Sequence, residues 1–367
     1  MNLTVRHNFI SGITPLNAAE TACRLAADCP EVIIGSKYGD SLSICVMDAL
    51  KSGLVCGGSE VIDMGRCLET QIFHTSFMTG YKKSIYFSSQ PEPGIYLRDR
   101  CIEVSEKKIN KLLCKESSES CCGNILNGHI FKGLYNKYIH SIIPKDFPLG
   151  ISVSSGAGNI ENLYGKGKDS IIIRLSDSGT KASVYTNSDG NISWEKLIMI
   201  CCMEMFECGS NVALPFEFPW AADILASHYN KRVYRYFTNG EGYDDYSRSL
   251  AVTQRFSLDG LILSLMVLKF LDSISMSFSE TLKKIPDFYV TKKFVPKSGV
   301  SINIPENFES SRGRSRILVS RSSGGVWLSA EGASMETAKE ICGDVENFLL
   351  ENSSDDINIW KKVLDNK

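Results

Sequence analysis

The sequence lacks the features that favour binding to long polyanions or insertion into a membrane. Its 367 residues carry 40 lysines and arginines against 42 aspartates and glutamates, which gives a formal net charge of −2. A general nucleic-acid binder has a basic excess, so we expect no nucleic-acid partner. The strongest apolar run, Leu258–Leu271, contains Asp259 and Lys269 and is too short to cross a bilayer. We therefore expect no membrane partner and interpret this run as a buried helix.

The cysteines also lack a pattern. There are 13 of them, an odd number at irregular spacings, which argues against a disulfide framework. The first ten residues lack the apolar core of a secretory signal peptide. Both observations predict reduced thiols and a cytoplasmic location. The best metal-like cluster is Cys114, Cys121, Cys122 and His129, and it lacks the paired CxxC spacing of a zinc site.

What the sequence does contain is a repeated unit of strand, turn, helix and strand. It occurs three times, with its strands and helix at Val32–Ile34, Ile44–Ser52 and Glu60–Met64; at Leu149–Val153, Ile160–Tyr164 and Ser170–Leu175; and at Val212–Leu214, Ala221–Tyr229 and Arg232–Phe237. In the second occurrence the helix is shortened to Ile160–Tyr164. Alternation of this kind predicts α/β units with at least partly parallel sheets.

The pattern of predicted helices and strands changes after Pro286. Four strands and a helix are predicted there, at Tyr289–Val295, Ser301–Ile304, Arg316–Ser320, Val326–Ala330 and Met335–Leu350, with a further short helix at Ile357–Leu364. Two other helices are predicted at Ser193–Cys208 and Leu258–Met276. The sequence therefore predicts an α/β protein with three tandem α/β domains containing mixed sheets, the second truncated, and a smaller C-terminal α+β domain. The expected boundaries are 1–133, 134–208, 209–284 and 285–367.

This order resembles the α-D-phosphohexomutase family, the phosphoglucomutases and phosphomannomutases. Val32–Gly35 and Gly57–Gly65 resemble the first domain, and Ser155–Asn159 resembles the glycine-rich turn that opens the second. Phe256–Gly260 resembles the start of the long helix in the third domain, and Arg321–Glu331 resembles the phosphate loop and next strand of the fourth. The resemblance implies transfer of a phosphoryl group within a hexose phosphate by a phosphoserine, with the help of Mg²⁺.

The family's serine loop reads Thr-Ala-Ser-His-Asn-Pro, and the corresponding stretch here is Tyr86–Tyr96. The resemblance makes Ser89 the candidate catalytic phosphoserine, with Ser88 as the next choice. The family's histidine and asparagine are absent, and loss of a positioned proton donor costs about 10²–10⁴ in rate. The alternative, that both serines belong to a turn bounded by prolines, stays open.

The family's metal loop, Asp-Gly-Asp-Ala-Asp-Arg, follows a strand of the second domain. Here the strand Ile171–Leu175 leads into Ser176–Lys181, and the three ligand positions read Ser176, Ser178 and Thr180. Mg²⁺ prefers anionic oxygen, and the single neighbouring carboxylate, Asp177, does not replace three. We expect no metal site and no cofactor, Mg²⁺ being needed only if the protein is an active mutase.

The remaining family loops are kept unequally. The first domain's Gly-Arg-Asp-x-Arg corresponds to Gly35–Asp40 here. Gly240–Glu241 matches the start of the family's sugar-reading loop, Gly-Glu-x-Ser-Gly, but it lies too near the preceding strand and lacks the Ser-Gly, which favours a loop turn over a sugar-reading loop. Arg321, Ser323 and Gly324 match the core of the phosphate loop, and a guanidinium, a hydroxyl and free backbone N–H groups suit a phosphate dianion. The alternative reading of this segment is a solvated basic hairpin.

These substitutions predict a phosphohexomutase-like protein of carbohydrate metabolism whose catalysis is degraded, a pseudoenzyme that binds a hexose phosphate or a protein partner. The alternative is an active, divergent phosphomannomutase or phosphoglucomutase, an isomerase that uses Ser89.

Overall fold

A computed structural model of the chain describes residues 3–6, 9–90, 92–115, 122–143, 149–154, 160–165, 170–236, 238, 245–296, 306–310, 315–322 and 325–351. Side chains at 160–162, 170, 306–310, 315–316 and 318–322 are not described. The chain forms two compact units, one from residues 1–201 and 248–281 and the other from residues 202–247 and 282–367. The described residues form four separate sheets, in agreement with the predicted α/β class.

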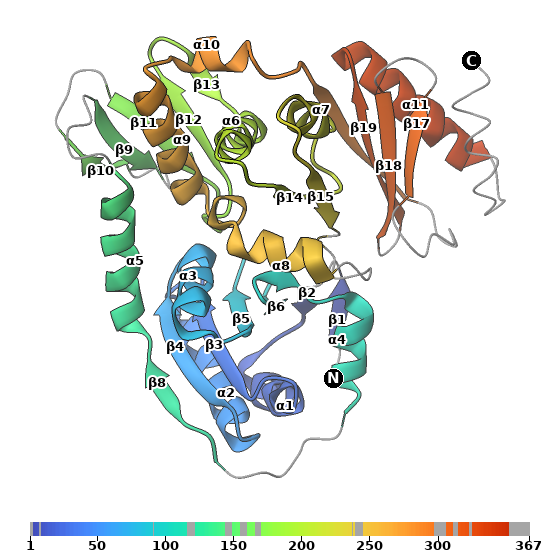
Figure 1. The fold of residues 1–367 in the computed structure, drawn as a ribbon. Helices are drawn as coiled ribbons and strands as arrows, with labels where there is room; N and C mark the ends of the chain where they lie inside the picture. The colour runs from blue at the N-terminus through green and yellow to red at the C-terminus, as the bar shows by residue number, and fades with distance from the viewer. Residues whose placement is uncertain are drawn as a thin grey trace. The chain divides into compact units, whose positions relative to one another are not determined.

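The first sheet is built around β3 (Glu31–Ser36), whose neighbours β4 (Glu60–Arg66) and β5 (Lys83–Ser88) both run parallel to it. Antiparallel strands extend the sheet beyond β5, so it is mixed, as predicted. Its order is β1-β2-β6-β5-β3-β4-β8 (Figure 1). Strand β7 pairs with β6 beside this path. The other strands are β1 (Thr4–Arg6), β2 (Phe9–Ser11), β6 (Gly94–Asp99), β7 (Ile102–Glu103) and β8 (Ile125–Asn127).

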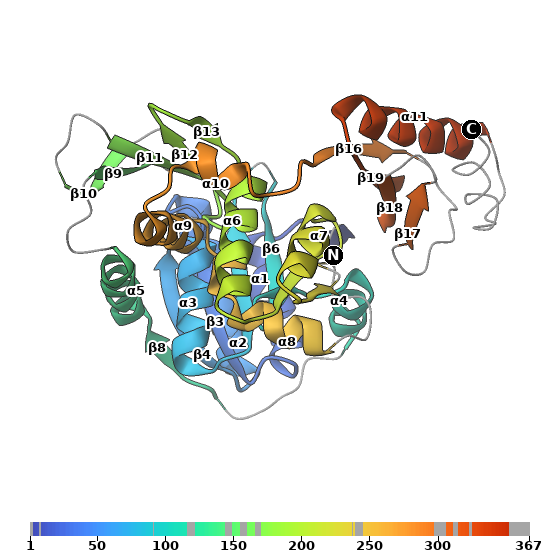
Figure 2. The same ribbon diagram turned by 45° about the horizontal axis from the view of Figure 1, so that its top comes forward.

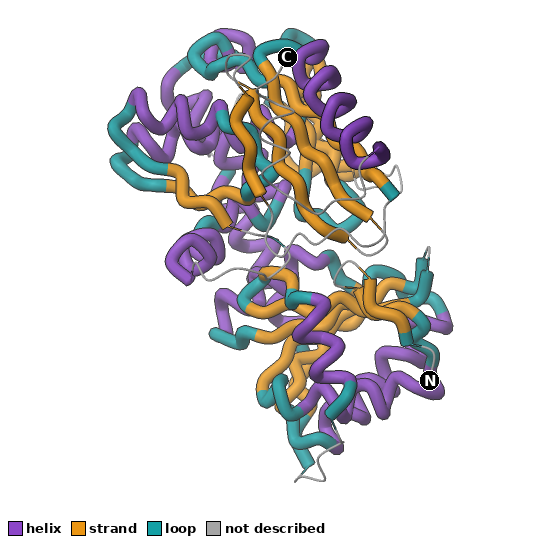
Figure 3. The backbone as a smooth tube through the Cα atoms, turned by 90° about the vertical axis from the view of Figure 1, so that its right-hand side faces the viewer, coloured by secondary structure: helices purple, strands orange, loops and turns teal. Residues whose placement is uncertain are grey.

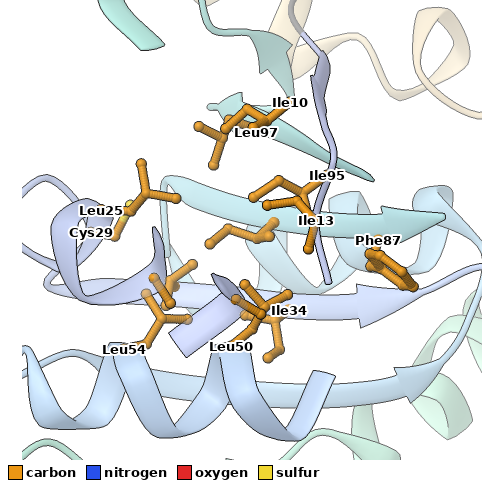
Figure 4. Packing of buried hydrophobic residues seen from close by; sticks show 14 of the residues in the cluster. Ile10, Ile13, Leu25, Cys29, Ile34, Leu50, Leu54, Phe87, Ile95 and Leu97 are labelled. Carbon is orange, nitrogen blue, oxygen red and sulfur yellow. The ribbon is translucent and has the colours of Figure 1, made fainter. Parts of the chain in front are cut away.

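Helices cover both faces of this sheet because its central strands are apolar on both sides. On one face, Ile34 of β3 packs in a core with α1 (Pro15–Ala26) and α2 (Ser41–Cys56), and Figure 4 shows Leu50 and Leu54 of α2 in that core. On the other face, Ile33 packs with residues of α3 (Glu69–Thr79) and α5 (His129–Ile142). Helix α4 (Glu106–Leu113) contacts α1.

The second sheet corrects one prediction. Ile160–Tyr164 is not a shortened helix but strand β10, which pairs antiparallel with β9 (Gly150–Ser154). A segment this short makes almost no internal helical hydrogen bonds, whereas as a strand it pairs with β9 at every position except Leu163, where the register shifts. The sheet has the order β10-β9-β11-β12-β13, and its other strands are β11 (Ser170–Leu175), β12 (Ala182–Thr186) and β13 (Gly190–Ile192).

The predicted apolar helix is α9 (Gly260–Ile274), preceded by the 3₁₀ turn η1 (Arg255–Ser257). It contacts β11, β12 and α5 (Figure 2). These contacts explain why nearly all residues of its first three turns are buried. Helix α10 (Phe278–Leu282) follows it. The predicted helix Ser193–Cys208 is α6 (Trp194–Glu207), and Ser193 caps its start, with its hydroxyl oxygen accepting a hydrogen bond from the N–H of Lys196 at 3.5 Å.

The second unit contains the other two sheets. Strands β14 (Val212–Pro215) and β15 (Val233–Tyr236) pair in parallel across α7 (Ala221–His228), and α8 (Asp245–Thr253) lies later in the chain. The last sheet is antiparallel, in the order β16-β19-β18-β17, and α11 (Met335–Glu351) packs on it (Figure 3). Its strands are β16 (Tyr289–Val295), β17 (Glu306–Ser310), β18 (Ser315–Ser322) and β19 (Gly325–Gly332).

The predicted strand Ser301–Ile304 and the predicted helix Ile357–Leu364 lie outside the described residues. In the part of the chain that is described, no helix is both long and apolar enough to span a bilayer. The four domain boundaries remain a prediction.

Replacing Gly53 tests the close packing of α1 on α2. A Cβ at this position would lie 2.0 Å from the carbonyl oxygen of Ala19 in α1, so Gly53→Ala should lower the free energy of unfolding by about 1–3 kcal/mol. The matched helical change Gly133→Ala, where a Cβ would meet no described atom within 4 Å, should leave stability unchanged or raise it by about 1 kcal/mol. Urea unfolding measures both, and equal effects would contradict this packing.

Candidate functional site

Two turns meet at the carboxyl end of the first sheet. Strands β3 and β5 are parallel neighbours, so the segments that follow them leave the sheet at the same edge. The backbone N–H of Lys37 donates to the carbonyl of Phe87 at 2.9 Å, which extends the pairing by one residue. Asp40 then caps α2 by accepting a hydrogen bond from the N–H of Ser43 at 2.7 Å.

Ser89, the predicted phosphoserine, is buried at this edge and bonded to the α2 cap. Its hydroxyl donates to Oδ2 of Asp40 at 2.7 Å, whereas the hydroxyl of Ser88 donates to the carbonyl of Gln90 in its own turn. The Ser43 N–H and then the Ser89 hydroxyl hold the pKa of Asp40 below its ordinary value. The carboxylate beside Ser89 is therefore ionised, and it is a weak base.

The turn that follows β11 is closed by its own side chains. The hydroxyls of Ser176 and Ser178 are 3.3 Å apart, and those of Ser178 and Thr180 are 2.8 Å apart. The N–H of Lys181 donates to Oγ of Ser176 at 3.1 Å, and the N–H of Ser176 donates back to the carbonyl of Lys181 at 2.9 Å. The three positions that resemble metal ligands are thus bonded to one another in a tight hairpin between β11 and β12.

Gly179 anchors this turn. Its φ of +79° is one that only glycine adopts without strain, and its carbonyl accepts a hydrogen bond from the N–H of Gly260 at 2.9 Å. A Cβ on Gly179 would meet the side chain of Thr70 at 3.0 Å. The turn is therefore held between the start of α3 and the start of α9.

An ion pair joins the two parts of the site. Nζ of Lys37 lies 2.9 Å from Oδ2 of Asp177, and the lysine side chain is 20% exposed while the aspartate side chain is 65% exposed. Partial burial opposes the charge on Lys37, but hydrogen bonds to Tyr38 and Asp177 outweigh it and raise the pKa of the lysine. Lys37 is therefore a permanent cation beside the β11–β12 turn.

These residues do not fit Mg²⁺. The three ligand positions present neutral hydroxyls that already bond to each other, and Asp177 is engaged by an ammonium group. Within the described ranges, no group of three or more His, Cys, Asp or Glu side chains is placed to share a metal ion. We therefore derive no step through a metal.

The predicted phosphate loop is described only in part. Arg321 lies in β18, where it pairs with Val326 of β19, while Ser323 and Gly324 lie outside the described residues, as do Gly240 and Glu241. Phosphate binding by this loop remains a prediction.

One cluster was missed by the sequence analysis. Asp259 is buried and caps α9 by accepting hydrogen bonds from the N–H groups of Leu261 and Ile262, while the Tyr135 hydroxyl donates to its other oxygen at 2.9 Å. The ring of His74 lies 5.4 Å from that of Tyr135, and its Nδ1 has no hydrogen-bond partner among the described residues. The Asp-Gly pair before an apolar run indicated the cap, but no local signal indicated that α3 and α5 would meet it.

Burial shifts the pKa values of both titratable groups of this cluster, Asp259 and His74. It raises the pKa of Asp259 to about 6, against the opposing effect of the helix N–H groups. It lowers the pKa of His74 to about 4, with the positive charge of Arg255 acting in the same direction. The Arg255 guanidinium itself lies over the rings of Phe77 and Tyr138.

Comparison with solved structures identifies the fold. The chain is similar to a phosphoglucomutase/phosphomannomutase family protein from Burkholderia thailandensis, with a TM-score of 0.69 and 13% sequence identity over 93% of this chain and 96% of that one. It is also similar to the exocytosis-sensitive phosphoprotein pp63/parafusin, a phosphoglucomutase from Paramecium in an open form, with a TM-score of 0.54 and 7% identity over 91% of each chain. No family model matches the sequence, and no curated protein matches it either.

The chain therefore has the multidomain fold of the phosphoglucomutases and phosphomannomutases, as the resemblance in its sequence predicted. At these identities the likeness shows the fold alone, and the activity has to be argued from the site.

The pH dependence of stability tests the buried cluster. Asp259 titrates near 6 when folded and near 3.8 when unfolded, so its contribution to the free energy of unfolding is fully present below pH 3.8 and is lost as the pH rises through 6. The contribution of His74, whose pKa is lowered from 6.5 to about 4, is fully present above pH 6.5 and is lost as the pH falls through 4. The two slopes oppose each other in this range.

Asp259→Asn removes the contribution of Asp259 to the pH dependence of the free energy of unfolding. Its free energy of unfolding should rise between pH 4 and pH 6 by about 2 kcal/mol more than that of the wild type. Asp272→Asn, at an exposed position near the end of the same helix, is the control and should follow the wild type. Chemical denaturation at intervals across this pH range makes the comparison, and parallel curves for all three proteins would contradict the burial of an ionisable Asp259.

Proposed function

We propose that this protein is a phosphohexomutase-like protein of hexose phosphate metabolism that has lost its mutase chemistry and binds a hexose phosphate without metal. The observation that carries the proposal is the turn after β11. In an active enzyme of this fold the sequence resemblance implies three aspartates and Mg²⁺ there. In this chain the same positions are hydroxyls bonded to one another.

The serine loop supports the same conclusion by an electrostatic argument. A phosphoryl group on Ser89 would carry its charge next to the Asp40 carboxylate, which accepts the serine hydroxyl at 2.7 Å. Like charges at this separation repel unless a cation lies between them. The turn that should supply a divalent ion offers neutral oxygens, and the ammonium group of Lys37 is paired with Asp177, so a stable phosphoserine is disfavoured.

Calorimetric titration with glucose 1-phosphate and mannose 1-phosphate, each with and without Mg²⁺, tests the proposal. We expect binding that does not depend on Mg²⁺ and that weakens about 10- to 100-fold in Arg321→Ala, because a charge-assisted contact to phosphate is lost. Arg232→Ala, at an exposed arginine of the same compact unit, should bind like the wild type.

Two outcomes would overturn this function. Binding that requires Mg²⁺ would mean that the site is not degraded. Absence of binding to either sugar phosphate would reject hexose phosphate binding. Binding to a protein partner, such as an active relative in the same cell, would then be the better explanation of the protein's function.

The competing function is an active phosphomannomutase or phosphoglucomutase, and one observation favours it. The Ser89 hydroxyl is oriented by a carboxylate, which is an arrangement that can polarise a nucleophile. An enzyme of this kind would interconvert the 1- and 6-phosphates of a hexose by way of Ser89.

We expect no Mg²⁺-dependent conversion of glucose 1-phosphate or mannose 1-phosphate above background, since the histidine of the family loop is replaced and the metal ligands are absent. A coupled assay for the hexose 6-phosphate measures this. Turnover that disappears in Ser89→Ala and persists in Ser88→Ala, whose hydroxyl bonds within its own turn, would establish the active enzyme instead.

A further inference from the structure

The β11–β12 turn has one more hydroxyl hydrogen than its internal hydroxyl contacts use. Ser176, Ser178 and Thr180 carry one hydroxyl hydrogen each, and the two O···O contacts between them use two of these hydrogens. Their oxygens also accept backbone hydrogens, from Lys181 at Ser176 and from Thr180 at Ser178. One hydroxyl hydrogen is therefore not used within the turn and can be donated to an anion, whereas the hydroxyl oxygens carry no charge that would hold a divalent metal ion.

Lys37 supplies the positive charge beside this turn. Its backbone is fixed to β5, its side chain is mostly buried, and its partner Asp177 is mostly exposed. An ion pair with one exposed member contributes about 0–1 kcal/mol, so another oxyanion can displace Asp177 from the ammonium group. The lysine that belongs to the turn itself, Lys181, lies over the ring of Trp194 with its Nζ 4.8 Å from the ring centre.

We propose that the β11–β12 turn and Lys37 form a metal-independent oxyanion site for a phosphate group, in which Asp177 is a built-in competitor for the lysine. The ammonium group takes over the charge that a divalent ion would contribute. This inference goes beyond the proposed hexose phosphate binding, because its ligand is phosphate without a sugar and Arg321 takes no part in it.

The nearby Asp40 limits how tightly this site binds. Its ionised carboxylate lies at the same edge of the first sheet as Lys37 and repels an incoming anion. Asp177 competes with phosphate for the ammonium group of Lys37. Neutralising Asp177 should therefore strengthen phosphate binding, whereas neutralising Lys37 should abolish it.

The experiment measures the dependence of the unfolding temperature on inorganic phosphate, with chloride replaced at constant ionic strength and pH 7.5. All proteins carry Arg321→Ala, so that the phosphate loop of the proposed function does not contribute to the signal. Ligand binding to the folded state raises the unfolding temperature with concentration, and the curve yields an apparent Kd. General stabilisation by phosphate as a salt is common to all variants and cancels in the comparison.

Asp177→Asn should bind phosphate about three- to fivefold more tightly than the parent, which is the effect of removing an ion pair of this kind. Asp48→Asn is the matched control, because its ion pair with Lys51 has almost the same geometry, 2.7 Å with side chains 64% and 19% exposed. It should leave the Kd unchanged. Lys37→Met should lose the response, and Lys37→Arg should keep it.

Equal phosphate responses in Asp177→Asn and Asp48→Asn would overturn the inference, and a gain of affinity cannot arise from misfolding. Mg²⁺ titrated in place of phosphate should not raise the unfolding temperature. A rise that Asp177→Asn abolishes would show a cation site instead. Failure of hexose phosphate binding with a phosphate response that depends on Lys37 would reject the proposed function and leave this site standing.

Discussion

The parallel pairing of β3 with β5 is the constraint on which the site depends. It places the segments after both strands at one edge, so that Lys37 bonds to Phe87 and Ser89 reaches the cap of α2. The pairing persists because β3 is apolar on both faces, with Ile33 and Ile34 in separate cores. Because β3 has apolar side chains on both faces, it is held in the centre of the sheet, and its position determines where the polar residues that follow it lie.

Electrostatics then decides what the site can do. A metal-dependent phosphoryl transfer needs anionic oxygens that hold a divalent cation, and the cation offsets the charge of the phosphoryl group. Here a fixed ammonium group pairs with the single carboxylate of the turn, and the neighbouring positions are neutral. The charges are balanced within the protein itself, so this arrangement gains little from a divalent ion and has a donor available for an anion.

Several elements could be predicted from short patterns. The strands at Val32–Ile34, Ser170–Leu175 and Tyr289–Val295 are rich in apolar and β-branched residues, and the structure confirms them. Ile160–Tyr164 was predicted wrongly because a five-residue apolar and polar mixture fits either period. Its state is decided by the free edge of β9, to which it adds as a neighbouring strand.

The sequence by itself determined the α/β class, the likeness to phosphohexomutases and the hydroxyl residues that follow the strand Ile171–Leu175, because these depend on residue type and local order. Only the tertiary structure decided that Lys37 meets Asp177, that Ser89 meets Asp40 and that Tyr135 meets Asp259. Residues up to 140 positions apart form these pairs. Such contacts follow from strand order and helix packing, which minimise exposed apolar surface over the whole chain and leave no trace in local sequence.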